Sequence, residues 1–84
     1  MSENLSENKM ENIALIFAKN PRLRIRDVSK MVKLSRGTIK TYIHLCKKHG
    51  LLPKKHKAEW TEKSIKNTWR KNGHKHLVAM LEKI

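Results

Sequence analysis

Residues 25–50, IRDVSKMVKLSRGTIKTYIHLCKKHG, predict two short helices joined by a tight turn, and this stretch decides the fold. The first helix is expected to run from Ile25 to about Val32. The second is expected to start at Ser35, which is a good N-cap residue, and to end at Gly50, because glycine often closes a helix C-terminus. At helical spacing, the side chains expected to face inward are Val28, Met31 and Val32, then Ile39, Tyr42, Ile43 and Cys46.

This stretch resembles the helix-turn-helix of bacterial, archaeal and phage regulators and transposases. Counted from Ile25, that family places apolar residues at the fourth, eighth, tenth, fifteenth and eighteenth positions and a small residue at the fifth, where the helices touch. The chain agrees at all six, with Val28, Ser29, Val32, Leu34, Ile39 and Tyr42. It departs at the ninth, where Lys33 replaces the usual glycine and would take a left-handed conformation at a cost of roughly 1 kcal/mol or more. Arg24 also stands where related sequences often place a Ser or Thr cap.

The residues after the second helix, Gly50-Leu51-Leu52, resemble the winged-helix branch of the same family, in which an apolar pair opens a β-hairpin wing. A wing would lie within residues 51–60, but that segment is short and lacks a clear turn pair such as Asn-Gly. The resemblance covers about residues 10–52. It implies a tri-helical core and leaves a winged and an all-helical form open.

A helix is also expected before this stretch, capped by Ser6 and ended by Asn20-Pro21, because proline biases the preceding residue away from helical dihedrals. Its buried face would be formed by Met10, Ile13, Ala14, Phe17 and Ala18. Residues 1–6 are expected to be a flexible, polar terminus.

Residues 61–84 predict a C-terminal helical extension. Thr61 could cap a helix that ends near Asn72-Gly73, with Ile65 and Trp69 inward and Trp60 folded over them. In the last segment, 77–84, the residues at helical spacing are Leu77, Met80 or Leu81, and Ile84. This segment could form a homodimer surface or close the chain's own core. The expected fold class is therefore mainly α, with residues 1–84 forming a single domain.

Charge is the strongest functional signal. The 84 residues include 20 Lys and Arg against 7 Asp and Glu, a formal net charge of +13. The imbalance is uneven, because residues 1–11 carry three Glu and one Lys, whereas residues 12–84 carry 19 basic and 4 acidic side chains, a net of +15. Such a domain is expected to bind polyanions and to be steered to them by its long-range field.

Other classes of protein are disfavoured. No apolar run approaches the roughly 20 residues that span a bilayer, and the polar, acidic N-terminus is not typical of a secretory signal. The lone Cys46 fits a reducing compartment, so a cytoplasmic, nucleoid-associated protein is expected. No metal is expected, because the candidate zinc ligands are poorly spaced: His44, Cys46, His49, His56, His74 and His76. No cofactor or small-molecule substrate is expected either, since a chain of 84 residues leaves little room for an enclosed pocket. The acidic residues are too scattered for catalysis, so no enzyme is expected: Asp27, Glu59, Glu62 and Glu82.

If residues 35–49 form a recognition helix, its outward side chains meet base edges in the major groove. The candidate base-reading residues are Ser35, Arg36, Thr38, Lys40, Thr41 and His44. Arg36 is the best candidate for bidentate contact with guanine, and Lys40 the next. The candidate phosphate contacts are Arg22, Arg24, Arg26, Lys30, Lys33, Lys47, Lys54, Lys55 and Lys57. A basic face of the fourth predicted helix, with Lys63, Lys66, Arg70 and Lys71, is more typical of a solvated surface.

The function expected from these features is sequence-specific binding of double-stranded DNA, as a small regulator of transcription. A dimer would require half-sites about 10 bp apart. Two alternatives stay open: an architectural or accessory subunit of a recombination or replication complex, and an RNA-binding module. The RNA alternative is weakened by the lack of aromatic residues expected at the surface, on which unpaired bases could stack.

Overall fold

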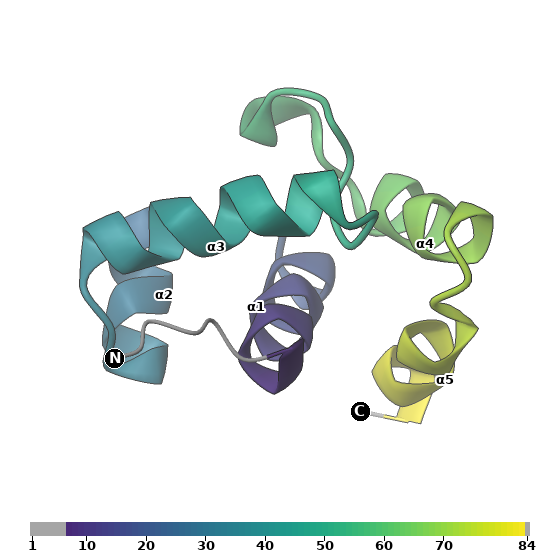
Figure 1. The fold of residues 1–84 in the computed structure, drawn as a ribbon, viewed down its shortest axis with the longest axis horizontal. Coiled ribbons are helices and arrows are strands. Elements are labelled where there is room, and N and C mark those ends of the chain that lie inside the picture. The colour runs from purple at the N-terminus through teal and green to yellow at the C-terminus, as the bar shows by residue number, and fades with distance from the viewer. Residues whose placement is uncertain (1–6, 84) are drawn as a thin grey trace.

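Five α-helices make up most of the computed structural model, which describes residues 7–83: α1 (Glu7–Lys19), α2 (Ile25–Val32), α3 (Arg36–Lys48), α4 (Glu62–Lys71) and α5 (Lys75–Lys83). A single 3₁₀ turn, Lys57–Glu59, lies between α3 and α4. The expectation of a mainly α fold is confirmed. Figure 1 shows α3 lying horizontally across the molecule, with the loop between α3 and α4 above it, α2 beneath its N-terminal end, α1 beneath its middle, and α4 and α5 beyond its C-terminal end.

Helix α1 is the centre of the packing, since it contacts α3, α4 and α5. The side chains expected on its buried face are all buried, and Ala14, Phe17 and Ala18 are completely so. The two alanines allow neighbouring helices to approach closely, while Phe17 fills the space between them. Its ring packs edge-on against Trp60, with the ring centroids 5.4 Å apart. The proposed cap Ser6 lies outside the described residues.

The connection from α2 to α3 follows the sequence closely. Lys33 adopts the left-handed conformation, with φ 57° and ψ 41°, and the following Leu34 N–H donates to the Ser29 carbonyl at 3.1 Å. The Ser29 hydroxyl in turn donates to the Leu34 carbonyl. Ser35 then caps α3, because its Oγ accepts a hydrogen bond from the Thr38 N–H at 3.2 Å. The turn is therefore closed by backbone bonds and by one small polar side chain.

The predicted core of α2 is wrong at one residue, Met31. Val28 is fully buried and Val32 partly buried, but Met31 is 57% exposed. Helix α2 is only eight residues long and packs mainly on α3, so its buried stripe is too narrow to include both Met31 and Val28.

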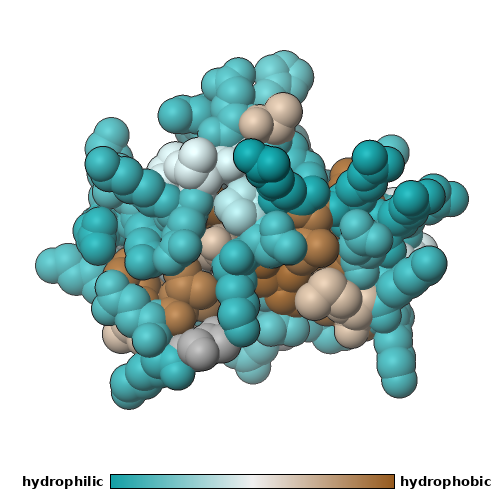
Figure 2. Space-filling view, turned by 180° about the vertical axis from the view of Figure 1, so that it is seen from behind, coloured by the Kyte–Doolittle hydropathy of each residue, from teal (hydrophilic) through white to brown (hydrophobic). Residues whose placement is uncertain are grey.

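Seen from behind in Figure 2, brown apolar surface shows at the centre of the molecule between hydrophilic side chains.

Residues 51–60 form a loop and one 3₁₀ turn and contain no strand, so the β-hairpin wing is not present in this segment. Gly50 turns the chain with a φ of 76°, and the N–H groups of Leu51 and Leu52 both donate to the Cys46 carbonyl. The Leu51 carbonyl accepts the indole N–H of Trp69 at 2.7 Å. Because these backbone groups are already bonded and Pro53 has no N–H, little is left to pair with a second strand.

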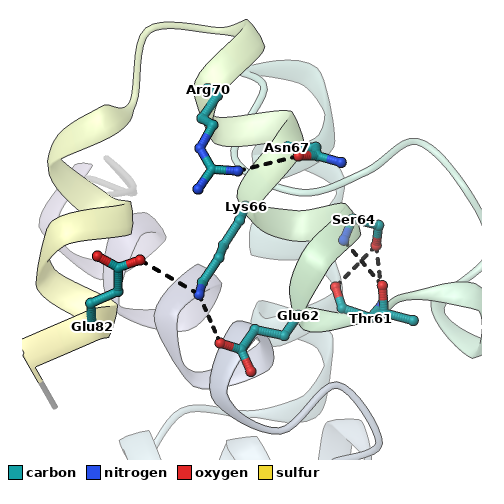
Figure 3. Close-up of polar contacts among 7 residues, drawn as sticks. All are labelled: Thr61, Glu62, Ser64, Lys66, Asn67, Arg70 and Glu82. Atoms are coloured by element: carbon teal, nitrogen blue, oxygen red, sulfur yellow. Dashed lines mark hydrogen bonds and ion pairs between the residues drawn. The ribbon is translucent and has the colours of Figure 1, made fainter.

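Thr61 is the N-cap residue of α4, as predicted. The Ser64 N–H donates to Thr61 Oγ1, and the Thr61 N–H donates to Ser64 Oγ, each at 3.0 Å (Figure 3). These reciprocal bonds satisfy two backbone donors that the first turn of a helix leaves without partners. The inward residues Ile65 and Trp69 are fully buried, and Trp60 is 4% exposed, so both tryptophans belong to the core as expected.

Helix α5 contributes most of its apolar side chains to the chain's own core. Leu77, Val78 and Leu81 are buried, whereas Met80 is 44% exposed. Of the two residues that the spacing left open, Leu81 is therefore the one that faces the core. Ile84 lies outside the described residues. Closing this core leaves Met80 as the one large apolar side chain exposed between residues 77 and 83.

Polar contacts join α5 to its neighbours. The Lys66 ammonium on α4 lies 3.0 Å from a Glu62 carboxylate oxygen and 3.9 Å from one of Glu82 on α5 (Figure 3). His76 on α5 lies 3.1 Å from a Glu11 carboxylate oxygen on α1.

Candidate functional site

A surface hollow lies where the N-terminal ends of α2 and α3 meet. Four of the five residues that line it are basic: Arg24, Arg26, Arg36 and Lys40, with Ile25 between them. Arg24 and Arg26 come from the start of α2, and Arg36 and Lys40 from the first two turns of α3. The tight turn between the helices thus places candidate phosphate contacts beside candidate base contacts. We call these four residues the basic hollow.

Asp27, close to this cluster in sequence, is bonded to the backbone and forms no ion pair with a basic side chain among residues 8–83. Arg24 is the N-cap residue of α2, and its guanidinium has no acceptor atom with which to cap the helix. Asp27, three residues later, accepts a hydrogen bond from the Arg24 N–H at 3.2 Å. The one carboxylate of α2 is therefore engaged with the backbone at the helix start, where a negative charge is also favoured by the helix dipole.

The basic hollow forms no ion pair within the part of the chain whose side chains the structure describes, residues 8–83. The ion pairs there join Lys66 to Glu62 and Glu82, and the other close approach to a carboxylate is that of His76 to Glu11, all on α1, α4 and α5. Arg24, Arg26, Arg36 and Lys40 are exposed or border solvent. Four like charges in one depression raise the local positive potential and attract anions.

The candidate base-reading residues divide into two groups. Arg36, Lys40, Thr41 and His44 are exposed on one side of α3. The hydroxyls of Ser35 and Thr38 lie 2.8 Å apart and belong to the helix cap, and Thr38 is half-buried. Thr41 Oγ1 donates to the Gly37 carbonyl at 3.1 Å, which leaves its methyl group and oxygen lone pairs for a ligand. The charged side chains of α3 are thus better placed for readout than the hydroxyls.

Lys48 also lies exposed on α3 and was missed by the sequence reasoning. It follows His44 by four residues, so the helical period alone could have identified it.

The candidate phosphate contacts also divide. The exposed ones are Arg22, Arg24, Arg26, Lys30, Lys33, Lys54 and Lys55. Lys30 and Lys33 lie at the C-terminal end of α2 and do not line the basic hollow. Lys47 is half-buried, with its ammonium 5.7 Å from the centre of the Trp60 ring.

Lys57 is drawn toward the protein rather than into solvent. Its ammonium lies 5.3 Å from the centre of the Phe17 ring, and the side chain is half-buried. Burial lowers the pKa of this ammonium, the positive charge of Arg24 lowers it further, and Asp27 acts in the opposite direction. Lys57 does not line the basic hollow and lies instead among the residues of the 3₁₀ turn and its neighbours, Pro21, Arg22 and Trp60.

Helix α4 has a basic surface of a different kind. Lys66 is paired with two carboxylates, and the Arg70 guanidinium donates to the Asn67 side chain at 3.4 Å. Lys63 and Lys71 are exposed. None of these residues lines the basic hollow, so the structure separates the α4 lysines from the α2–α3 cluster.

The thiol and the histidines do not form a chemical site. Cys46 is buried, its Sγ lies 3.5 Å from the Met10 carbonyl, and burial raises the pKa of its thiol to about 12. His74 Nε2 lies 3.1 Å from the His49 carbonyl oxygen. Between residues 7 and 83, no three His, Cys, Asp or Glu side chains are placed to hold a metal ion. Nor does that part of the chain contain a helix with the length and apolar character needed to cross a membrane.

Comparisons of the chain with protein-family models, with curated protein sequences and with solved structures found no match.

Proposed function

We propose that this protein binds double-stranded DNA through a helix-turn-helix formed by α2 and α3. The observation that carries the proposal is the basic hollow, where cationic side chains from the N-terminal ends of both helices face one depression with no ion pair to neutralise them among residues 8–83. In helix-turn-helix complexes the N-terminal residues of the second helix contact bases while the first helix crosses the phosphate backbone. Arg36 and Lys40 suit the first role, and Arg24 and Arg26 the second.

The distribution of aromatic residues favours duplex DNA over unpaired nucleic acid. The chain has one Phe, one Tyr and two Trp, and all four are 4% exposed or less: Phe17, Tyr42, Trp60 and Trp69. Proteins that bind single strands stack successive bases on exposed aromatic rings, and single-stranded RNA is read in the same way. This protein therefore exposes charge without exposing a Phe, Tyr or Trp ring. Such a surface suits a phosphate backbone whose bases are already paired.

The finer proposal is a sequence-specific regulator of transcription. Arg36 would make a bidentate contact with guanine, whereas Arg24, Arg26 and the exposed Lys54 and Lys55 would contact phosphates without reading sequence. Loss of a good base contact costs about 1–3 kcal/mol of discrimination. In an architectural protein with the same fold, replacing such a residue would instead lower the affinity for all DNA sequences by the same amount.

The test is fluorescence anisotropy with three probes, random-sequence duplex DNA, single-stranded DNA and a structured RNA, across a salt series. We expect tighter binding to the duplex and a log–log salt slope of about −0.9 for each phosphate contacted. Tighter binding to RNA or to single strands, or no binding at low salt, would overturn the proposal.

A matched pair of variants localises the surface. Arg26→Gln and Lys71→Gln each remove one exposed positive charge, the first from the basic hollow and the second from α4. We expect Arg26→Gln to weaken binding and to lower the magnitude of the salt slope by about 1, and Lys71→Gln to change neither. The opposite pattern would place the interface on α4.

Sequence readout is tested by selecting bound duplexes from a random pool, once with the parent protein and once with Arg36→Ala. If Arg36 reads a base, the parent protein should enrich a preferred base that Arg36→Ala no longer selects. No enrichment in either selection would favour an architectural role.

A further inference from the structure

A second surface, separate from the basic hollow, carries apolar side chains along the outer side of α1. Three shallow hollows adjoin there, and Asn12 lines all of them. The largest is floored by Leu15, Ile16, Leu23 and Met31, between α1 and α2. Leu15 extends it toward Met80 on α5. We call the strip formed by Leu15, Ile16, Leu23, Met31 and Met80 the methionine groove.

Both ends of the methionine groove are exposed methionines. Met31 is 57% and Met80 44% exposed, and they are the large hydrophobic side chains that residues 8–83 leave open to solvent. An apolar strip with a polar border is typical of an interaction site. Methionine is unbranched and adapts to the shape of a partner, and it is common in grooves that receive amphipathic helices.

The charges around the groove indicate the kind of partner. Lys9 and Lys19 line it, whereas Glu11, the one acidic side chain among residues 8–83 that lines these hollows, lies 3.1 Å from His76. A second copy of this chain would bring the same lysines against them and would add another charge of +13. Like charges placed opposite one another at an interface are unfavourable. An occupant with an apolar stripe and carboxylates on either side of it would complement both the floor and the border.

We propose that the methionine groove binds an acidic amphipathic helix of another protein. No residue of this groove lines the basic hollow, so the partner helix and a ligand at α3 can be held together. The proposal does not rest on the proposed DNA binding, because its surface, its charges and its ligand are different.

The experiment uses the full chain labelled with ¹³C at the methionine methyl groups. The probe is a synthetic peptide of about 18 residues with leucines at i, i+3, i+4 and i+7 and glutamates between them. The control peptide has the same composition in scrambled order. We expect the amphipathic peptide to shift the methyl signals of Met31 and Met80 in a saturable way while the buried Met10 changes little. Equal shifts with the scrambled peptide, or none with the amphipathic one, would overturn the proposal.

Variants then separate the groove from general charge attraction. Met31→Ser and Met80→Ser should each weaken peptide binding about tenfold or more, with duplex DNA binding unchanged and the protein still folded, because each side chain is about half exposed. Lys63→Ser, on α4, is the matched surface control and should leave peptide affinity within about twofold.

Sedimentation analysis tests whether a second copy of the chain or the chain's own N-terminus occupies the groove instead. A dimer abolished by Met31→Ser would assign the groove to a second copy, and a change of the Met31 signal on deletion of residues 1–6 would assign it to the chain's own N-terminus.

Discussion

Gly50 and Gly73 offer a matched pair of substitutions in which only one meets a neighbouring side chain. Both have left-handed backbones, with φ 76° at Gly50 and 79° at Gly73. A Cβ added at Gly73 would meet nothing within 4 Å. A Cβ added at Gly50 would fall on the Asn72 side chain, overlapping its Cγ and lying 2.6 Å from its Cβ and 2.7 Å from its Oδ1. Because the Cβ of Asn72 is involved, rotation of that side chain cannot remove the overlap.

The two alanine variants should therefore differ in stability by the cost of this overlap. Gly73→Ala should lower the free energy of unfolding by about 1–2 kcal/mol, the cost of left-handed backbone for a residue with a Cβ. Gly50→Ala should lose the same amount plus about 1–3 kcal/mol for the overlap, the usual range for overpacking. The effect of glycine on the unfolded chain is similar in both variants and cancels in the comparison. A difference of 1 kcal/mol corresponds to about 4–8 °C in melting temperature for a chain of this size.

Urea unfolding followed by tryptophan fluorescence measures both variants, with circular dichroism as a second probe of cooperativity. The double variant Gly50→Ala/Asn72→Gly, compared with Asn72→Gly alone, removes the overlap and should show only the cost found for Gly73→Ala. The Asn72→Gly background is needed because Asn72 Nδ2 also donates to the Thr68 carbonyl at 2.8 Å. Equal losses for Gly50→Ala and Gly73→Ala would refute the close approach of the α3 and α4 ends.

Three further predictions concern single side chains. Lys33→Gly should raise the free energy of unfolding by up to about 1 kcal/mol, because glycine relieves the left-handed strain but gains freedom in the unfolded chain; a loss of stability in urea unfolding would contradict this. Trp69→Phe should lower stability by about 1–3 kcal/mol, since the buried Leu51 carbonyl loses its indole donor, and thermal unfolding should show the loss. Burial raises the pKa of Cys46 to about 12 from 9.0, so the folded state retains a proton that the unfolded state releases, and stability should fall as the pH rises from about 9 toward 12. The free energy of unfolding is measured against pH for the parent protein and for Cys46→Ala, and the difference between the two isolates the contribution of the thiol. If both proteins show the same dependence on pH, the prediction is wrong.

Local patterns were sufficient where one or two neighbouring turns decide the conformation. The apolar spacing in residues 10–18 identified the buried face of α1, and Thr61 was recognised as a cap because its bonds reach only three residues along the chain. Lys33 was identified as the left-handed residue of the turn from its position in the helix-turn-helix pattern. A wing in residues 51–60 could not be judged in this way, because the bond that occupies the Leu51 carbonyl comes from Trp69, 18 residues later.

In the candidate site, too, the sequence predicted what depends on local spacing and missed what depends on how the helices pack. Helical spacing placed Arg36 and Lys40 on the outside of α3, but it could not show that Arg24 and Arg26 line the same hollow or that Lys47 and Lys57 turn toward Trp60 and Phe17. Met31 was assigned to the core because its spacing is helical. Its exposure follows from the single main neighbour of α2, which is a property of the assembled fold.

The sequence by itself determined that this protein is helical, where each helix of residues 25–50 begins and ends, and that its charge is strongly positive. These properties depend on dihedral preferences, capping and composition, all of which act within a few residues or over the whole chain. Tertiary structure alone decided which cations share a hollow, that residues 51–60 form a loop and a 3₁₀ turn, and which apolar side chains stay uncovered. These depend on how far each helix can bury its face against its neighbours, because side chains distant in sequence meet only when the helices pack.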